Sequence, residues 1–598
     1  MFTTVDYCIF AAFIGLSMLV GIYHALKSSR QQAKAVKSEK TAEFLLGGRK
    51  LPIIPVCLSL LTTFISGLSL LGAPAEIYQR GFLFWPMYWS SAIAFLISGY
   101  FFVPIFYKLQ ATSVYEYFEK RYDSKLLRRI GAALFLSTTW FYMAVVMYAP
   151  AIALTGVTQV PLWPFILAVG LASTFYTSIG GMKAVIWTDT IQAFFIYLGI
   201  GILLFKGTSD AGGLQEVFRI SMVSGRFDAL KRTDPSPLQH NNLWLMTFGS
   251  VLWWSTMYGL NQMALQRYCS MPSLKHARIL IGITVPAFLI LGSMCCYIGV
   301  VMLAYFYYCN PIESGEIESQ DQLVILFAAK VLGFFPGLPG LFLACLFSGT
   351  LSTISSGINS MTAVLWEDFL KDSHAVRLGD TGSANLNKMC AFIFGIGATL
   401  MAFLCQYMDG MINAANSVLG AIAGPLAGLF FLGIFFPRAN KNGAFIAVIL
   451  TVSFFLFCSV GHNLNHPYAD YALPTNFTCE KNETFFGSLN ASHSATSSAF
   501  VHAPYDPHYG KPEVFFAYKL SAFSYAPLSV AMVIVIGYVA SILMPQKMTP
   551  YQRKLAYSLT YVGRNTFMND QRTMMSKDGE SLIHKSEEMN IMPSLRLK

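Results

Sequence analysis

The amino-acid sequence predicts an all-α polytopic membrane protein. Of its 598 residues, 55% are hydrophobic and only 12% are charged, which excludes an ordinary soluble protein. A helix needs about 20 apolar residues to cross the hydrocarbon core of a bilayer, and about thirteen stretches meet this requirement. The predicted spans leave no room for a separate soluble domain, and their approximate limits are 5–26, 52–74, 82–107, 130–154, 161–180, 184–206, 243–266, 277–307, 338–368, 388–406, 411–436, 443–460 and 521–544.

The basic residues predict how the chain is oriented. Seven Lys and Arg residues lie in 27–50, six in 108–129 and nine after Met544, whereas the connection 308–325 has none and is acidic. The positive-inside rule therefore places the N-terminus outside and the tail 545–598 in the cytoplasm, so that residues 1–544 form the membrane domain of a plasma-membrane protein. Because these inner loops explain the net charge of +10, that charge does not indicate a nucleic-acid partner.

Two loops that we predict to lie outside carry features of extracellular proteins. Cys309 and Cys479 fall in different outer loops, where disulfides persist, and we expect them to pair. The loop 461–520 is predicted to be glycosylated, since it holds three N-linked sequons, at Asn476, Asn482 and Asn490.

The second span, 52–74, has a polar centre. Thr62, Thr63, Ser66 and Ser69 surround Gly67 at membrane depth, which is a poor sequence for a helix interior. An unwound segment here would release backbone carbonyls that hold a cation. Packing of Ser and Gly against a neighbouring helix explains the same residues equally well.

A carboxylate lies at the start of the sixth span, 184–206. Asp189 stands where a charge costs about 2.5–3.5 kcal/mol at the helix centre and less near an end. Gln192 follows three residues later on the same face. This position favours a role in coupling rather than in folding, and the alternative is an interfacial Asp that caps the helix.

The seventh span, 243–266, is interrupted by Gly259, Asn261 and Gln262. The second and seventh spans are thus both broken, and five spans separate their starts. We therefore predict two inverted repeats, 52–206 and 243–436, because an odd number of spans per repeat reverses the orientation of the second copy. Broken helices at corresponding positions of such repeats indicate a transporter binding site.

Hydroxyl groups follow one face of the ninth span, 338–368. Helical spacing aligns five side chains, with Thr353 and Ser360 at the border: Ser348, Ser352, Ser355, Ser356 and Asn359. Such a stripe must face protein or water, because lipid offers hydroxyls no partner. Hydroxyl and carbonyl oxygens are ligands of hard cations, although tight helix packing is the more frequent reason for such a stripe taken alone.

Several motifs of the chain resemble the sodium/solute symporter family. They are EFLLGGR at 43–49, the segment 55–78, GGMKAVIWTD at 180–189, YGLNQ and QRY within 258–268, and PGLPGLFLACLFSGTLSTISS at 336–356. The likeness covers residues 5–544 and is greatest to the multivitamin, monocarboxylate and iodide symporters. It implies a LeuT-type fold of five plus five inverted repeats with extra helices.

The resemblance also implies site residues. The family's main sodium site matches the carbonyl oxygens of Thr62, Ile65 and Gly349 and the hydroxyls of Ser352 and Thr353. Positions linked to sodium coupling and to the inner gate match Asp189 and Gln192. Substrate-contacting positions match Ser69, Asn261 and Gln262.

Departures from the family pattern narrow the expected substrate. Sugar-transporting members have a His where this chain has Ser69, and they use a Glu on the third span and a Lys on the eighth. Here 82–107 and 279–303 carry no charged residue. Iodide-type members have a Gln at the Ser69 position, so the small residue resembles the monocarboxylate and multivitamin members.

The sequence thus predicts a sodium-coupled symporter that imports a small organic anion, in the range from a monocarboxylate to a vitamin such as biotin or pantothenate. Sodium is the expected co-transported ion. The alternatives are a symporter for an inorganic anion such as iodide, and an uncoupled channel or sensor on the same fold. No P-loop, zinc-type Cys/His spacing or catalytic set indicates an enzyme.

Overall fold

The computed structural model describes residues 3–34, 40–109, 111–158, 160–312, 314–317, 320–407, 411–465, 511–549, 552 and 555–556. These residues form helices joined by turns, with no strand among them. The α-helices are α1 (Thr4–Lys34), α2 (Lys40–Leu46), α3 (Ile53–Phe64), α4 (Gly67–Arg80), α5 (Trp85–Ile97), α6 (Val103–Leu109), α7 (Glu116–Tyr122), α8 (Lys125–Thr158), α9 (Leu162–Asp210), α10 (Leu214–Val223), α11 (Ser250–Ser255), α12 (Gln262–Cys269), α13 (Leu274–Tyr305), α14 (Leu323–Leu332), α15 (Leu338–Leu365), α16 (Lys371–Leu404), α17 (Met411–Phe435), α18 (Lys441–Asn465) and α19 (Tyr525–Leu543).

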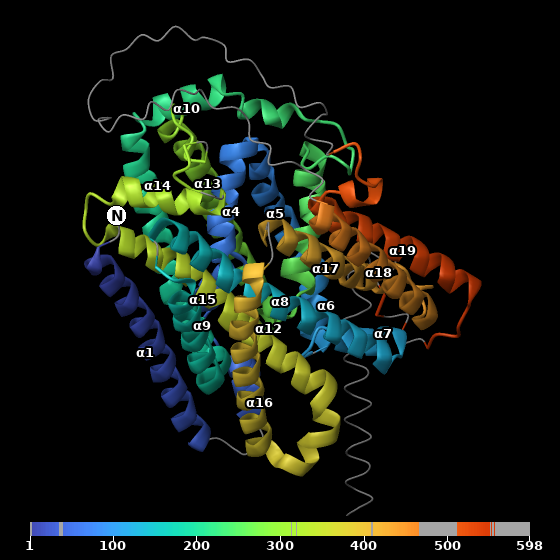
Figure 1. The fold of residues 1–598 in the computed structure, drawn as a ribbon. Coiled ribbons are helices and arrows are strands. Elements are labelled where there is room, and N and C mark those ends of the chain that lie inside the picture. The colour runs from blue at the N-terminus through green and yellow to red at the C-terminus, as the bar shows by residue number, and fades with distance from the viewer. Residues whose placement is uncertain are drawn as a thin grey trace, which may run out of the picture.

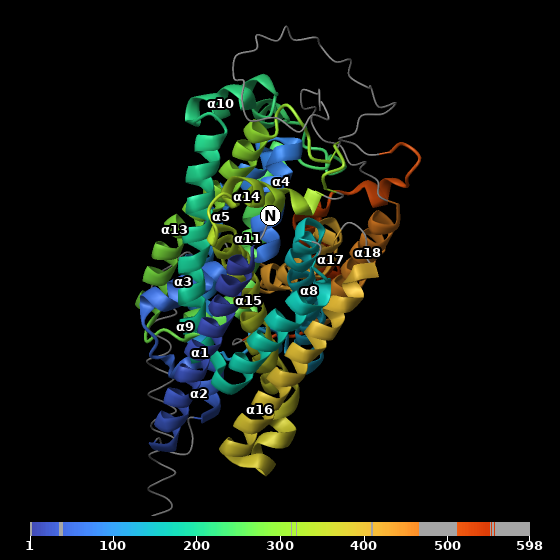
Figure 2. The same cartoon turned by 60° about the vertical axis from the view of Figure 1, so that its left-hand side comes forward.

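The long helices run between two ends of the molecule. α10 lies at one end and α7 lies toward the other, together with the bent part of α16 (Figure 1). We call these the α10 end and the α7 end. The view in Figure 2 shows the same arrangement, with α10 and α2 at opposite ends. α1 begins nearer the α10 end and runs toward the α7 end (Figure 1).

The count of candidate spans is lower than the number of predicted ones. Ten of the described helices are long and apolar enough to cross a membrane, or eleven if the bent pair of α3 and α4 is one span, rather than about thirteen. One reason is that the 49 residues of α9 hold both predicted spans 161–180 and 184–206, and the two helical parts meet at a non-helical kink at Gly181, whose φ of 56° and ψ of −153° favour glycine. The other is that short α and π segments break the predicted span 243–266.

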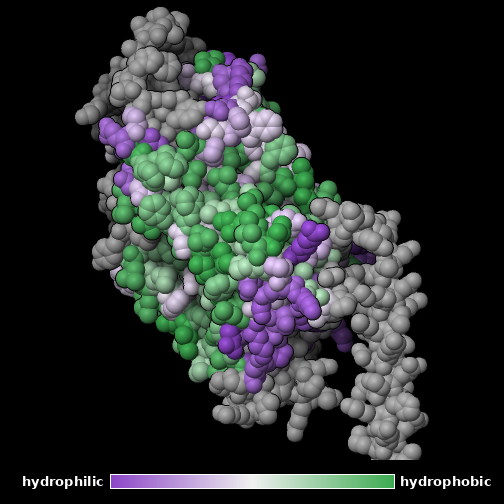
Figure 3. All heavy atoms as spheres, turned by 90° about the vertical axis from the view of Figure 1, so that its right-hand side faces the viewer, coloured by the Kyte–Doolittle hydropathy of each residue, from purple (hydrophilic) through white to green (hydrophobic). Residues whose placement is uncertain are grey.

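The surface exposes many large apolar side chains. Figure 3 shows a broad band of hydrophobic side chains between more hydrophilic regions. Large apolar side chains such as Leu19, Phe205 and Leu400 are more than half exposed, and water disfavours so many of them in one band. Together with the apolar helices, this makes the protein a multi-pass membrane protein.

α15 is the most enclosed of the long helices. Its most apolar window is 94% buried, against 28% for α1, and it packs against α1, α3, α8 and α9. Asp6 of α1 binds its N-terminal end, accepting hydrogen bonds from the backbone N–H groups of Gly337 at 2.9 Å and Gly340 at 3.0 Å. The polar stripe therefore faces protein, as the sequence requires.

Both spans that the sequence predicts to be broken are broken. α3 and α4 meet at 57°, and Ile65 and Ser66 between them have non-helical backbone angles. In the predicted span 243–266, a π-helical segment ends at Leu260, and the extended residue Asn261 directly precedes α12. Ser66 and Asn261 each cap the helix that follows through their side-chain oxygen. The boundaries of the two repeats stay a prediction.

Several predictions concern the loop 461–520 and the tail 545–598. Asn476, Asn482, Asn490 and Cys479 lie outside the described residues, as does most of the tail. Cys309 is disulfide-bonded, and nine other cysteines of the described part are free.

We expect Cys309 to pair with Cys479, because both lie in loops that the charge pattern places outside. Peptide mass spectrometry of the non-reduced protein should identify a cross-linked fragment that holds both residues and that disappears on reduction. A free thiol at either position would contradict the pairing.

Candidate functional site

The break between α3 and α4 lies against the middle of α15. Ser352 Oγ donates a hydrogen bond to Thr62 Oγ1 at 2.8 Å, and Thr353 Oγ1 donates to the carbonyl of Thr63 at 3.1 Å. Both hydroxyls are completely buried. The hydroxyl stripe of α15 therefore meets the non-helical segment, as the sequence predicts for a cation site.

Gly349 allows this close approach. A Cβ atom at its position would lie 3.0 Å from the carbonyl oxygen of Ile65 and 3.0 Å from the backbone nitrogen of Gly67. A larger residue would push α15 away from the break. Five residues predicted to hold sodium thus lie together: Thr62, Ile65, Gly349, Ser352 and Thr353.

The chemistry of this group suits a hard, singly charged cation. The available oxygens are hydroxyls and backbone carbonyls, which are ligands of hard cations. All five residues are neutral, so a bound ion is held without a full opposing charge in its first shell. Among the described residues, no cluster of three or more His, Cys, Asp or Glu side chains has the arrangement of a transition-metal site.

A buried ion pair adjoins this site. Arg267 Nη2 lies 3.1 Å from Asp189 Oδ2, and both side chains are almost completely inaccessible. Ser59 donates to the same carboxylate oxygen and accepts from Arg267 Nε at 2.9 Å. Arg267 also donates to Ser356 Oγ. Side chains of α3, α9, α12 and α15 therefore meet around one charge pair.

Hydroxyl groups join the ion pair to the junction of α15 with the α3–α4 break. Ser356 lies one helical turn after Ser352 on α15, and its Oγ is 3.0 Å from Thr63 Oγ1. The other oxygen of Asp189, Oδ1, and the side-chain amide of Gln192 are buried and form no hydrogen bond with the described residues. Asp189 and Gln192 thus face the interior of the helix bundle, and the alternative of an interfacial cap on α9 is wrong for Asp189.

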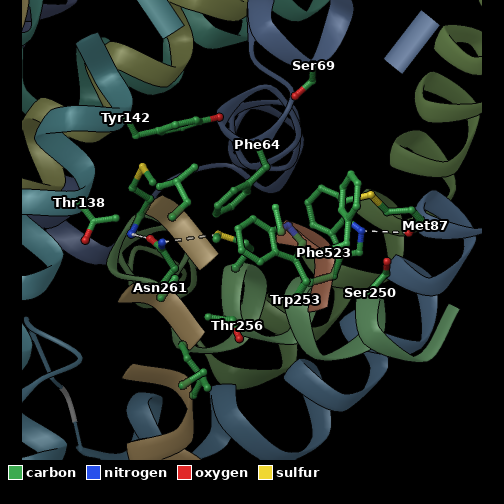
Figure 4. A pocket seen from close by; sticks show the side chains of 18 of the residues that line it. Phe64, Ser69, Met87, Thr138, Tyr142, Ser250, Trp253, Thr256, Asn261 and Phe523 are labelled. Atoms are coloured by element: carbon green, nitrogen blue, oxygen red, sulfur yellow. Dashed lines mark hydrogen bonds between the residues drawn. The ribbon is translucent and has the colours of Figure 1, made fainter. Parts of the chain in front are cut away.

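A cavity of about 200 Å³ lies beside the break in α3 and α4 (Figure 4). Ser69 of α4 and Asn261 at the start of α12 both line it, as predicted for substrate contacts. Most of the wall is aromatic or aliphatic, and it includes Phe64, Tyr88, Trp253, Trp254 and Phe523. Among the described lining residues, Glu76 is the only charged one, and none is basic.

Gln262 was predicted to contact substrate, but its side chain lies elsewhere. Its Oε1 accepts a hydrogen bond from the backbone N–H of Val114 at 2.9 Å, and its Nε2 donates to the carbonyl of Thr112 at 2.7 Å. It does not line the cavity. Asn261 and Gln262 are neighbours in sequence, but the helix start between them turns their side chains to different surroundings.

Further polar contacts hold the helices together toward the α7 end. Gln266 Oε1 accepts hydrogen bonds from Asn359 at 3.2 Å and from Ser360 at 2.8 Å. Nearer that end, Arg128 of α8 pairs with Asp368, which follows α15. These bonds connect α8, α12 and α15 beneath the cavity.

Comparison with known proteins gives the family of this chain. A model of the sodium:solute symporter family matches residues 44–451. The chain belongs to the sodium:solute symporter family. Among curated members, it is 37% identical over 475 residues to sodium-coupled monocarboxylate transporter 2 of Danio rerio. The aligned part is 79% of this chain and 73% of that protein. It is 36% identical over 502 residues to the sodium-dependent multivitamin transporter of Oryctolagus cuniculus. Here the aligned part is 82% of this chain and 77% of that protein.

The symporter fold is also found in a solved structure. A substrate-bound, outward-open Na⁺-coupled sialic acid symporter superposes with a TM-score of 0.72 at 20% identity, covering 91% of this chain and 98% of that one. This likeness confirms the LeuT-type fold class that the sequence predicts.

The sequence alone does not identify Arg267 as part of this group of buried residues. Arg267 is visible there as a basic residue at the inner end of the seventh span, but its partner Asp189 is 78 positions away. A charged pair buried in the membrane is the usual reason for a cation at such depth. The rule suggests that Arg267 has a buried acidic partner. The packing of α9 against α3 and α15 shows that this partner is Asp189.

Proposed function

We propose that this protein imports a small organic anion together with sodium across the plasma membrane. Sodium-coupled symport of an organic solute follows from family membership. The observation that carries the proposal at the level of residues is the contact of Thr62 with Ser352 and of Thr63 with Thr353, where hydroxyls and freed carbonyls meet at the centre of the bundle.

The sodium ion binds at this junction in the proposed mechanism. Hydroxyl oxygens of Ser352 and Thr353 and carbonyl oxygens of Thr62, Ile65 and Gly349 form its shell. Because all are neutral, the ion leaves readily once the site opens to the cytoplasm. Inward movement of each positive charge gains about 2.3 kcal/mol per 100 mV, so an excess of sodium over anion charge makes import electrogenic.

The proposed substrate class rests on the cavity and on the relatives. The described cavity wall has no basic side chain, so bound sodium supplies the positive charge that an anion requires. Two relatives are named for monocarboxylates and vitamins. The apolar wall with a few polar groups suits a carboxylate that carries an apolar body. An iodide-like inorganic anion would leave most of this apolar wall without a partner.

The way the cavity is bounded supports a mechanism of alternating access. It reaches from Asn261 at the break to Phe523 near the α10 end. On the other side, the Gln262 and Gln266 bonds and the Arg128–Asp368 pair hold the helices together. We assign the α10 end to the outside, in agreement with the basic loops at the opposite end. Transport then requires the contacts beneath the cavity to open while those above it close.

Uptake of labelled substrates by cells that express the full chain tests this proposal. We expect sodium-dependent accumulation of at least one acid from a panel of short monocarboxylates, biotin and pantothenate. Replacing sodium by choline should abolish it. Uptake of glucose or iodide without any carboxylate, or a flux that does not depend on sodium, would refute the proposed function.

A further inference from the structure

We propose that Glu76 is a specificity-determining residue that accepts a hydrogen bond from a donor group at the far end of the substrate. The preferred substrates are therefore organic acids whose other end carries a hydroxyl, an amine or an amide N–H. This inference rests on the proposed function, because it assumes that an organic anion occupies the cavity.

The position of Glu76 on α4 places it at one end of the cavity wall. Ser69, Gly72, Ala73 and Glu76 all line the cavity, and this spacing is one face of a helix. Ser69 lies beside the break, whereas Glu76 is two turns farther along, about 10 Å away. The cavity thus has a break end, with Ser69 and Asn261, and a carboxylate end.

Glu76 is fixed by neighbours and still reaches the cavity. Arg80 Nη1 lies 3.1 Å from Glu76 Oε2, and Asn241 Nδ2 donates to Oε1 at 3.0 Å. The Glu76 side chain keeps 16% of its surface exposed. A carboxylate offers about four acceptor positions, so these bonds hold its orientation and leave capacity for a donor on the cavity side.

The charge at this end is well defined. His240 Nε2 lies 3.4 Å from Glu76 Oε1. Burial, together with the charge of Arg80, lowers the pKa of His240 to about 4. The imidazole is therefore neutral at physiological pH, and Arg80 provides the positive charge that faces Glu76.

This arrangement sets the direction in which an anion binds. A substrate carboxylate near Glu76 gains no net attraction, because Arg80 already balances the charge of Glu76, whereas at the break end it meets the capped start of α4 and the proposed sodium ion. The aromatic side chains Tyr88, Trp253 and Trp254 along the wall accommodate an apolar body. An acid about 10 Å long with a donor at its far end satisfies both ends at once.

A simpler role for Glu76 is purely structural. It joins α4 to Asn241 and His240 in the loop before α11, and its loss would then affect all substrates alike. A test must therefore compare substrates that differ only in the terminal donor. Hexanoate and 6-hydroxyhexanoate form such a pair, and 6-aminohexanoate adds a donor that also carries a positive charge at neutral pH.

The experiment measures sodium-dependent uptake of the three acids, normalised to surface expression. In the parent protein we expect kcat/KM for the two donor-bearing acids to exceed that for hexanoate by roughly tenfold or more, as for a hydrogen bond to a charged group. Glu76→Ala should lower uptake of the two donor-bearing acids more than that of hexanoate, so that the preference disappears, and Glu76→Gln should reduce the preference. Ser250→Ala, which removes a hydroxyl of the same cavity wall that donates to the carbonyl of Leu245 and not to Glu76, is the matched control and should keep the preference.

The other outcomes separate the possibilities. Absence of a preference in the parent protein, or equal losses for all three acids in both Glu76 variants, would overturn the inference while leaving organic-anion symport intact. Absence of sodium-dependent uptake of every acid in the parent protein would overturn the proposed function itself, and the inference with it.

Discussion

Asp189→Asn is expected to lower sodium-dependent uptake at least a hundredfold and to reduce the amount of folded protein at the cell surface. Asp189 is the counter-ion of Arg267, and both are buried. Removing one partner of a buried ion pair leaves the other charge uncompensated, which costs about 3–5 kcal/mol. From the sequence alone, Asp189 was expected to act in coupling and not in folding. The ion pair with Arg267 predicts both effects.

A double variant separates the two roles. In Asp189→Asn with Arg267→Gln, no unpaired charge remains, and two amides can bond to each other, to Ser59 and to Ser356. We expect surface expression and thermal stability to recover most of the loss seen in Asp189→Asn. Sodium-dependent uptake should stay low, because the carboxylate oxygens next to the hydroxyl stripe are still missing.

Surface biotinylation, thermal unfolding and uptake against sodium concentration test this expectation in the parent, the two single variants and the double variant. The thermodynamic cycle gives the coupling energy of the pair. Full recovery of sodium-dependent uptake in the double variant would show that Asp189 serves only to neutralise Arg267. Normal stability of both single variants would show that the pair is not buried as a unit.

The parts of the site that the sequence predicts correctly are those set by local rules. Helical spacing brings Ser352 and Ser356 to one face whatever surrounds them. The hydroxyl and glycine residues from Thr62 to Ser69 disfavour a continuous helix, and the break at Ile65 and Ser66 lies among them. The observed contact of Ser352 with Thr62 then joins two segments that the sequence marks separately.

What the sequence does not predict depends on packing between distant segments. The direction of the Gln262 side chain is set by the backbone of Thr112 and Val114, about 150 positions earlier. The Asp189–Arg267 pair likewise needs α9 and α12 to meet around α3. The predicted boundary between the spans 161–180 and 184–206 is a local feature, since the chain has non-helical backbone angles at Gly181, where the two helical parts of α9 meet.

Ser352→Ala and Thr353→Ala are expected to raise the sodium concentration for half-maximal uptake about tenfold each, with folding largely retained. Each variant deletes one hydroxyl of the five proposed ligands, and a tenfold change in affinity corresponds to about 1.4 kcal/mol. Each also removes one hydrogen bond, from Ser352 to Thr62 or from Thr353 to the Thr63 carbonyl. Such a bond contributes about 0.5–1.5 kcal/mol to stability, so the fold should tolerate its loss.

The choice of control decides what this result means. Ser360 lies at the border of the same stripe, but its Oγ donates to Gln266 at 2.8 Å and thus takes part in the contacts beneath the cavity. Ser348 is a better choice, because its Oγ donates to the carbonyl of Ala344 within α15 itself. Ser348→Ala removes a buried hydroxyl from the same stripe without removing a proposed ligand, and its sodium curve should coincide with that of the parent. If α15 uses its hydroxyls for packing alone, all three curves will coincide, because Ala packs as tightly as Ser. A shift in the Ser352 and Thr353 variants that is absent in Ser348→Ala assigns sodium binding to the junction of α15 with the α3–α4 break.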